Sequence, residues 1–230
     1  MRSPTWLFDL DNTLHNASHA IFPAINVNMN QFIKRVLEDG GLPSDDAAVD
    51  ALRYDYWKRY GVTLLGMVRH HGVNQTDFLH AAHTFLDLPS MVRAERGLLR
   101  LLRRLPGRKI LLTNAPRKYA RELMRELGLQ RDFRQQISVE MMRVHGRLHP
   151  KPSRRFLRKL LAKEGLPASG CVLVEDTLAN LKAAKAVGMR TVWITQFLPI
   201  QEQLAKRPAY VDVKVKSVRR LTGNLRRLPT

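Results

Sequence analysis

The chain has 230 residues, and 44% of them are hydrophobic, a share that excludes a disordered polypeptide. Its 39 Lys and Arg residues outnumber 20 Asp and Glu residues, which gives a formal net charge of +19 and attracts phosphorylated metabolites, nucleotides or nucleic acid. The single cysteine, Cys171, excludes an internal disulfide. The N-terminal apolar stretch ends at Asp9, too early for a signal peptide or membrane helix, so we expect a cytoplasmic protein with no membrane partner.

Short apolar runs predict the strands in chain order. Five strands are expected over residues 5–8, 109–113, 136–139, 171–175 and 190–194, with a last edge strand over 210–213. Helical periodicity connects the later strands, with apolar faces over residues 98–105, 119–129, 156–161 and 178–187. We expect the tail from Leu221 onward to fray. Strands that alternate with helices in this way predict an α/β protein with a doubly wound parallel sheet.

One long interval, from His15 to Ser90, lacks a strand pattern. Its apolar spacing predicts four helices, over residues 21–36, 51–60, 64–70 and 78–86. We therefore predict two domains. A core is formed by residues 1–14 and 92–230, and an all-helical insert, residues 15–91, follows the first strand.

Two carboxylates follow the first predicted strand, in the segment Asp9-Leu10-Asp11-Asn12-Thr13. Side chains two apart on an extended chain point the same way, so both acids can face the carboxyl edge of the sheet, where α/β proteins bind ligands. One carboxylate can attack phosphorus, while the other exchanges a proton with the leaving oxygen and with water. Two acids beside a phosphate require a hard cation, which favours Mg²⁺. An ordinary acidic turn is the alternative.

Three further segments place polar groups where predicted strands or loops end. Thr113 and Asn114 precede a helix and can bind phosphate, or can simply cap that helix. Lys151 lies between two prolines and can neutralise a carboxylate or a phosphate, although a lysine in so basic a chain is more often a solvated one. Glu175 and Asp176 follow a buried strand and can hold a metal, or can favour the start of a helix.

In type, order and position, these four segments resemble the four motifs of the haloacid dehalogenase-like superfamily, and the resemblance spans Asp9 to Asp176. It implies a Rossmann-like core, dependence on Mg²⁺ and a helical type 1 cap at the place of the insert. It further implies Asp9 as nucleophile and metal ligand, and Asp11 as general acid and base, with its main-chain carbonyl on the metal.

The same resemblance assigns the remaining motif residues. It implies Thr113 as a phosphate ligand, Lys151 as the charge that stabilises the reacting group, and Asp176 as a metal ligand with Glu175 beside it. The dehalogenases that name the superfamily lack the second acid of the first motif, so Asp11 favours phosphoryl transfer.

A finer resemblance links residues 8–14, 56–61 and 64–66 to the pyrimidine 5′-nucleotidase-like members, although His15 stands where those members often carry Tyr. We therefore expect a phosphomonoester hydrolase acting on nucleoside 5′-monophosphates. One alternative is a phosphatase or phosphomutase for another small phosphorylated metabolite. The other is a basic nucleic-acid-binding protein on a phosphatase-like scaffold, which no nucleic-acid-binding motif supports.

Aromatic and imidazole groups gather in the helical insert. Tyr56 and Tyr60 can stack on a base, and His70 and His71 can contact a phosphate or a base. Packing between neighbouring helices is the interpretation we favour for the tyrosines, and an ordinary surface position for the histidines.

Overall fold

The computed structural model describes residues 3–223, and their packing divides the chain into two compact units. One unit contains the residues up to Ser18 together with those from Val92 onward, and the other contains His19–Met91. None of the described helices combines the length and the apolar character that crossing a lipid bilayer requires.

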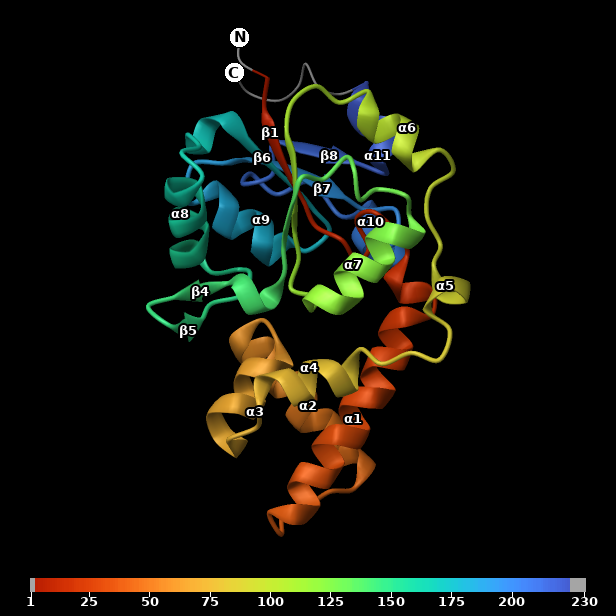
Figure 1. Ribbon diagram of the computed structural model, residues 1–230, viewed down its shortest axis with the longest axis vertical. Coiled ribbons are helices and arrows are strands. Elements are labelled where there is room, and N and C mark those ends of the chain that lie inside the picture. Colours follow the sequence, from red (N-terminus) through yellow and green to blue (C-terminus); the bar gives the residue numbers. More distant parts are fainter. Residues whose placement is uncertain (1–2, 224–230) are drawn as a thin grey trace. The chain divides into compact units, whose positions relative to one another are not determined.

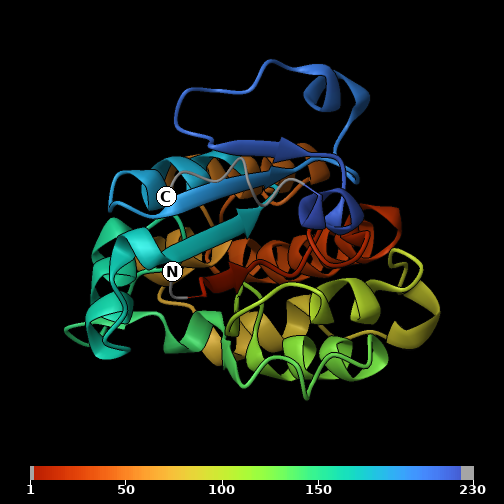
Figure 2. The same ribbon diagram turned by 90° about the horizontal axis from the view of Figure 1, so that it is seen from above.

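A six-stranded sheet forms the centre of the first unit, and every neighbouring pair of strands runs parallel. The strand order is β3-β2-β1-β6-β7-β8, and Figure 2 shows β6, β7 and β8 side by side with the same direction. The strands are β1 (Thr5–Phe8), β2 (Lys109–Leu112), β3 (Gln135–Ile137), β6 (Cys171–Glu175), β7 (Arg190–Ile194) and β8 (Val213–Val215). The predicted α/β class and parallel sheet are therefore confirmed. The order reverses between β1 and β6, the place where such sheets bind ligands.

Helices cover both faces of this sheet because successive residues of a strand face opposite sides. Leu7 is buried in one cluster with Leu157 of α8 and Leu181 of α9, whereas the ring of Phe8 meets that of Phe133 edge-on, with centroids 5.8 Å apart. Figure 1 shows α8 and α9 on one side of the sheet and α7 on the other. The helices of this unit are α6 (Leu98–Arg103), α7 (Arg117–Glu126), α8 (Arg154–Lys163), α9 (Leu178–Lys185), α10 (Ile200–Leu204) and α11 (Val218–Thr222).

The last strand lies later in the chain than predicted. We expected residues 210–213, but β8 covers Val213–Val215. The Asp212 carboxylate accepts hydrogen bonds from the Thr191 backbone N–H (2.9 Å) and from Lys185 Nζ (2.6 Å). These contacts use the segment before Val213 to hold the start of β7, so strand pairing begins only after it.

Two short elements escaped the sequence patterns. A hairpin, β4 (Arg143–Val144) and β5 (Arg147–Leu148), turns through two residues of positive φ, 48° at His145 and 75° at Gly146. In the expected frayed tail, α11 instead reaches Thr222, and Leu221 within it is fully buried. Residues 224–230, which that expectation also covered, lie outside the described residues.

The second unit, all of whose residues are described, contains helices and no strand. The helices are α1 (Ile21–Asp39), α2 (Asp46–Tyr60), α3 (Thr63–His71), α4 (Gln75–Ala82) and α5 (Leu88–Met91). Helices α2 and α3 approach closely at Gly66, where an added Cβ would lie 2.1 Å from Cγ of Tyr56. Helix α4 ends at Ala82, not at residue 86 as predicted, because the Thr84 hydroxyl and the His83 ring bond to carbonyls of the last turn.

Candidate active site

Three neighbouring strands, β2, β1 and β6, end in polar side chains at the carboxyl edge of the sheet. Asp9 directly follows β1, Thr113 follows β2, and Glu175 and Asp176 lie at the end of β6. Pairing of β1 with β6 continues one residue past the end of β1, since the Asp9 N–H donates to the Val174 carbonyl at 3.0 Å. The polar side chains are therefore fixed by a rigid sheet, as the strand-end motifs predicted.

Lys151 is the cation at the centre of this group. Its Nζ donates to Asp9 Oδ1 at 2.6 Å and to Glu175 Oε2 at 2.7 Å, and only 3% of its side chain is exposed. Burial opposes the charge of Lys151, but the carboxylates of Asp9 and Glu175 outweigh it and raise its pKa. Lys151 is thus a buried ammonium group, not a solvated surface lysine.

A pair of hydrogen bonds holds the backbone of this lysine. The Asn114 side-chain amide donates to the Lys151 carbonyl at 3.0 Å and accepts from the Lys151 N–H at 2.9 Å. The Thr113 hydroxyl oxygen accepts from the Ala115 N–H at 3.0 Å. Thr113 is 1% exposed. The two motif residues after β2 therefore organise the loops around the acidic group.

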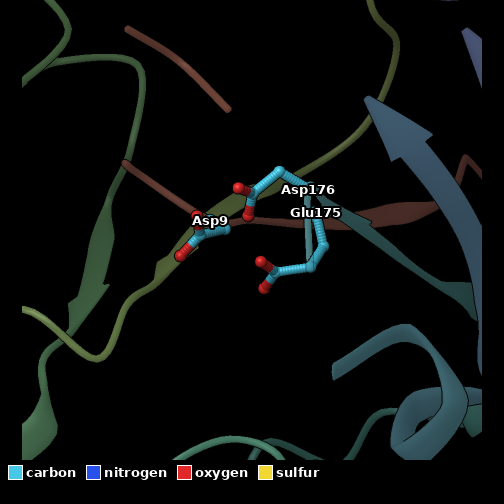
Figure 3. A group of neighbouring side chains, drawn as sticks. All are labelled: Asp9, Glu175 and Asp176. Atoms are coloured by element: carbon cyan, nitrogen blue, oxygen red, sulfur yellow. The ribbon is translucent and has the colours of Figure 1, made fainter. Parts of the chain in front are cut away.

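Three carboxylates converge here, as Figure 3 shows for Asp9, Glu175 and Asp176. One oxygen from each lies within 4.8 Å of the others. Burial, followed by the charge of Glu175, raises the pKa of Asp9 to about 7 against the opposing effect of Lys151. Burial and the charges of Glu175 and Asp9 also raise the pKa of Asp176.

The donor set fits a hard divalent cation. Burial, together with repulsion between the carboxylates, raises the pKa values of Asp9 and Asp176, and a bound cation would favour their ionised forms. Both oxygens of Glu175 already accept hydrogen bonds, one from Lys151 Nζ and one from the Thr177 N–H at 3.2 Å. Asp9 and Asp176 are the better direct ligands, and oxygen ligands of this kind suit Mg²⁺.

Asp11 is held by two side chains that the motifs did not identify. The Tyr119 hydroxyl donates to Asp11 Oδ1 at 2.6 Å, and His15 Nε2 lies 2.8 Å from the same oxygen. The Tyr119 ring is 2% exposed and His15 is fully buried. The sequence placed Tyr119 on the apolar face of a helix, and nothing in that pattern indicated that its hydroxyl reaches Asp11.

The chain turns sharply at Asn12, directly after Asp11. Asn12 has a φ of 58°, a left-handed conformation in which Asn is enriched. Its side chain donates to Ser18 Oγ at 2.8 Å and accepts from the Ser18 N–H at 3.1 Å. These two bonds tie the segment that follows Asp11 to Ser18.

The aromatic residues of the helical unit contact one another. The Tyr56 hydroxyl lies 2.9 Å from His71 Nε2, and the Tyr60 hydroxyl lies 2.7 Å from His70 Nε2. The rings of Tyr56 and His70 are stacked with centroids 5.3 Å apart. Within their own unit, these side chains pack between α2 and α3.

Comparison with known proteins agrees with this geometry. The family model that describes haloacid dehalogenase-like hydrolases matches residues 5–188 of this chain. A phosphoglycolate phosphatase of Pseudomonas fluorescens (strain Pf0-1) is 25% identical over 202 residues, which are 82% of this chain and 68% of that protein.

Solved structures share the fold. An HAD phosphatase from Thermococcus onnurineus is similar with a TM-score of 0.64, 18% identity and 98% of each chain covered. CbbY from Rhodobacter sphaeroides, solved in complex with phosphate, gives a TM-score of 0.63, 20% identity and 96% coverage of each chain. Since the family model spans most of the chain and the strand-end acids lie where its motifs predict, this protein belongs to the haloacid dehalogenase-like hydrolase family.

Proposed function

We propose that the protein hydrolyses phosphate monoesters and that the carboxylate of Asp9 is the nucleophile. The observation that carries this proposal is the arrangement of two acids with one buried cation. Asp9 is fixed 2.6 Å from Lys151 Nζ, and Asp11, two residues later, is held separately by Tyr119 and His15. A nucleophile and a proton donor with different surroundings are what a two-step phosphoryl transfer requires.

In the first step, an Asp9 oxygen forms a bond to phosphorus while the bond from phosphorus to the ester oxygen breaks. Protonated Asp11 gives its proton to that leaving oxygen. In the second step, Asp11 takes a proton from water, the water oxygen bonds to phosphorus, and the bond to Asp9 breaks. Free phosphate leaves, and both acids return to their starting states.

Other residues hold the phosphate and its charge. Lys151 stabilises the negative charge that builds on the transferring group, and Asn114 positions Lys151 through its backbone. We assign Thr113 to a phosphate oxygen, since its hydroxyl can donate outward while its oxygen accepts from Ala115. A direct contact of Asn114 with phosphate stays a prediction.

The metal site proposed for Mg²⁺ consists of Asp9, Asp176 and the main-chain carbonyl of Asp11. A bound Mg²⁺ would neutralise the phosphate and orient it for attack. Glu175 fixes Lys151 and the start of α9 beside the metal ligands.

The substrate is the finer part of the proposal. The resemblance of residues 8–14, 56–61 and 64–66 suggested a nucleoside 5′-monophosphate, whereas the curated relative is named a phosphoglycolate phosphatase. Both are phosphate monoesters, so the core residues serve either one. Side chains outside these core motifs are then the basis of any preference between them.

Phosphate release in the presence of Mg²⁺ tests the proposal, with phosphoglycolate and nucleoside 5′-monophosphates as substrates. We expect turnover of at least one ester and a loss of about 10⁴-fold or more in the variant Asp9→Asn. The matched control is Asp46→Asn, which makes the same chemical change at a side chain that is 97% exposed. Turnover that survives in Asp9→Asn would overturn the mechanism.

A further inference from the structure

A groove in the first unit is lined by five arginines together with Gly97, Leu99 and Leu101. Its volume is about 1020 Å³, and it lies where α11 packs against α6, two helices that are adjacent in Figure 1. Leu98, Leu101 and Leu102 of α6 are buried, whereas the arginines between and after them are exposed. The arginines of the groove, which we call the arginine groove, are Arg96, Arg100, Arg103, Arg104 and Arg219.

Only part of this charge is neutralised by the protein. Arg103 pairs with Asp132 at 2.9 Å, and Arg219 pairs with Glu95 at 3.1 Å. Among residues 3–223, no ion pair engages the guanidinium groups of Arg96, Arg100 and Arg104. Like charges this close along a chain repel one another and lower stability. A bound anion would remove that repulsion.

The chemistry of the groove selects the kind of anion. One guanidinium group can donate to two oxygens of a phosphate at once. A volume of about 1020 Å³ accommodates far more than one small ion. No aromatic side chain is among the lining residues, so the groove lacks the stacking platforms that single-stranded nucleic acids use. Contacts with the outer phosphates of a duplex need no such platform.

None of the residues that line the arginine groove belongs to the acidic site. After α6 the chain runs along the amino end of β1, where Trp6 Nε1 donates to the Pro106 carbonyl at 2.8 Å. Asp9 and Asp176 lie at the opposite, carboxyl ends of the strands. We propose that the arginine groove binds the phosphate backbone of duplex nucleic acid, without base readout and independently of phosphate hydrolysis.

Fluorescence anisotropy with a short labelled DNA duplex tests this proposal. The duplex carries 5′-hydroxyl ends, so that it offers the acidic site no phosphate monoester. Binding is measured over a range of salt concentrations for the wild type and for Arg100→Gln/Arg104→Gln. The control, Arg155→Gln/Arg158→Gln, changes the net charge equally at two exposed arginines of α8.

The expected result is specific to the groove. In the groove variant, the slope of log K against log salt concentration should decrease in magnitude by about 2. The variant loses two arginines, and each neutralised phosphate contributes about 0.9 to the slope. At about 0.1 M salt this corresponds to a loss on the order of 50-fold in affinity. The control pair should shift the slope by less than about 0.5, and both variants should keep the wild-type phosphatase activity.

Three outcomes would overturn the proposal. They are no salt-dependent binding by the wild type, equal losses in the groove and α8 variants, or tighter binding of a single strand of the same length. Circular dichroism melting verifies that each variant folds. If the double variant does not fold, the single change Arg96→Gln, outside α6, should reduce the slope by about 1, and no reduction would reject the groove.

Discussion

Replacing Lys151 by methionine removes a buried cation while keeping most of the side-chain volume. Its Nζ contacts Asp9 at 2.6 Å and Glu175 at 2.7 Å, and all three side chains are at most 8% exposed. Removing one partner of a buried ion pair costs about 3–5 kcal/mol, a large part of the roughly 5–15 kcal/mol that stabilises a folded protein. We expect the metal-free variant to melt roughly 10 °C below the wild type.

The loss should depend on pH in a defined direction. Without Lys151, the pKa values of the neighbouring carboxylates rise further, because burial and mutual repulsion are no longer opposed. A carboxyl group whose pKa is raised in the folded state favours folding at low pH, and that contribution is lost as pH rises through the folded pKa. The gap in melting temperature should therefore be small at about pH 5 and large at about pH 8.

Thermal unfolding followed by circular dichroism at both pH values measures this effect. Lys118→Met, at an exposed position of α7, is the control for losing a lysine. The double variant Lys151→Met/Glu175→Gln should regain part of the stability but none of the phosphate release. A Lys151→Met protein as stable as the wild type, or destabilised equally at both pH values, would refute the reasoning.

Three further predictions concern the acids. Tyr119→Phe removes the hydroxyl that lies 2.6 Å from Asp11, so kcat should fall about 10- to 100-fold with KM nearly unchanged; steady-state kinetics with an unchanged kcat would contradict this role. Mg²⁺ at about 100 times its Kd should stabilise the wild type by about 2.7 kcal/mol but not Asp176→Asn, and equal melting shifts would exclude Asp176 as a ligand. The pKa of Asp9 is raised from 3.8 to about 7, so folded Asp9 holds its proton more tightly than unfolded Asp9. The free energy of unfolding of the metal-free wild type should thus fall as the pH rises from 3.8 to about 7. If denaturant titrations show the same fall in the Asp9→Asn variant, Asp9 is not its cause.

The strand-end residues could be predicted because the physics that places them is local. A short apolar run ending in acids defines both a buried strand and the edge at which its last side chains emerge, as with Phe8 and Asp9. The order of the segments along the chain then predicts that these edges meet. The sheet confirms the parallel arrangement, with β1 between β2 and β6.

Contacts between distant residues could not be predicted in this way. Tyr119 reaches Asp11 across 108 positions of the chain, and its place on an apolar helix face indicates only burial. Asn114 reaches the Lys151 backbone across 37 positions. Both depend on how the loops after β2 and before α8 pack, which no sequence period encodes.

Short elements were missed for a different reason. The hairpin β4–β5 has two residues in each strand, too few for an alternation of polar and apolar residues to be recognised. The start of β8 is displaced because Asp212 bonds to Thr191 and Lys185, a tertiary effect that overrides strand propensity.

The central claim is that Asp9 carries the phosphoryl group between the two steps. Rapid acid quenching of the enzyme during turnover, followed by mass spectrometry of its peptides, tests this most directly. We predict a phosphoryl group on the peptide that contains Asp9, located on that side chain and absent from the Asp9→Asn variant. Steady phosphate release with no modification of Asp9 at any quench time, or with the phosphoryl group on another residue, would contradict the account.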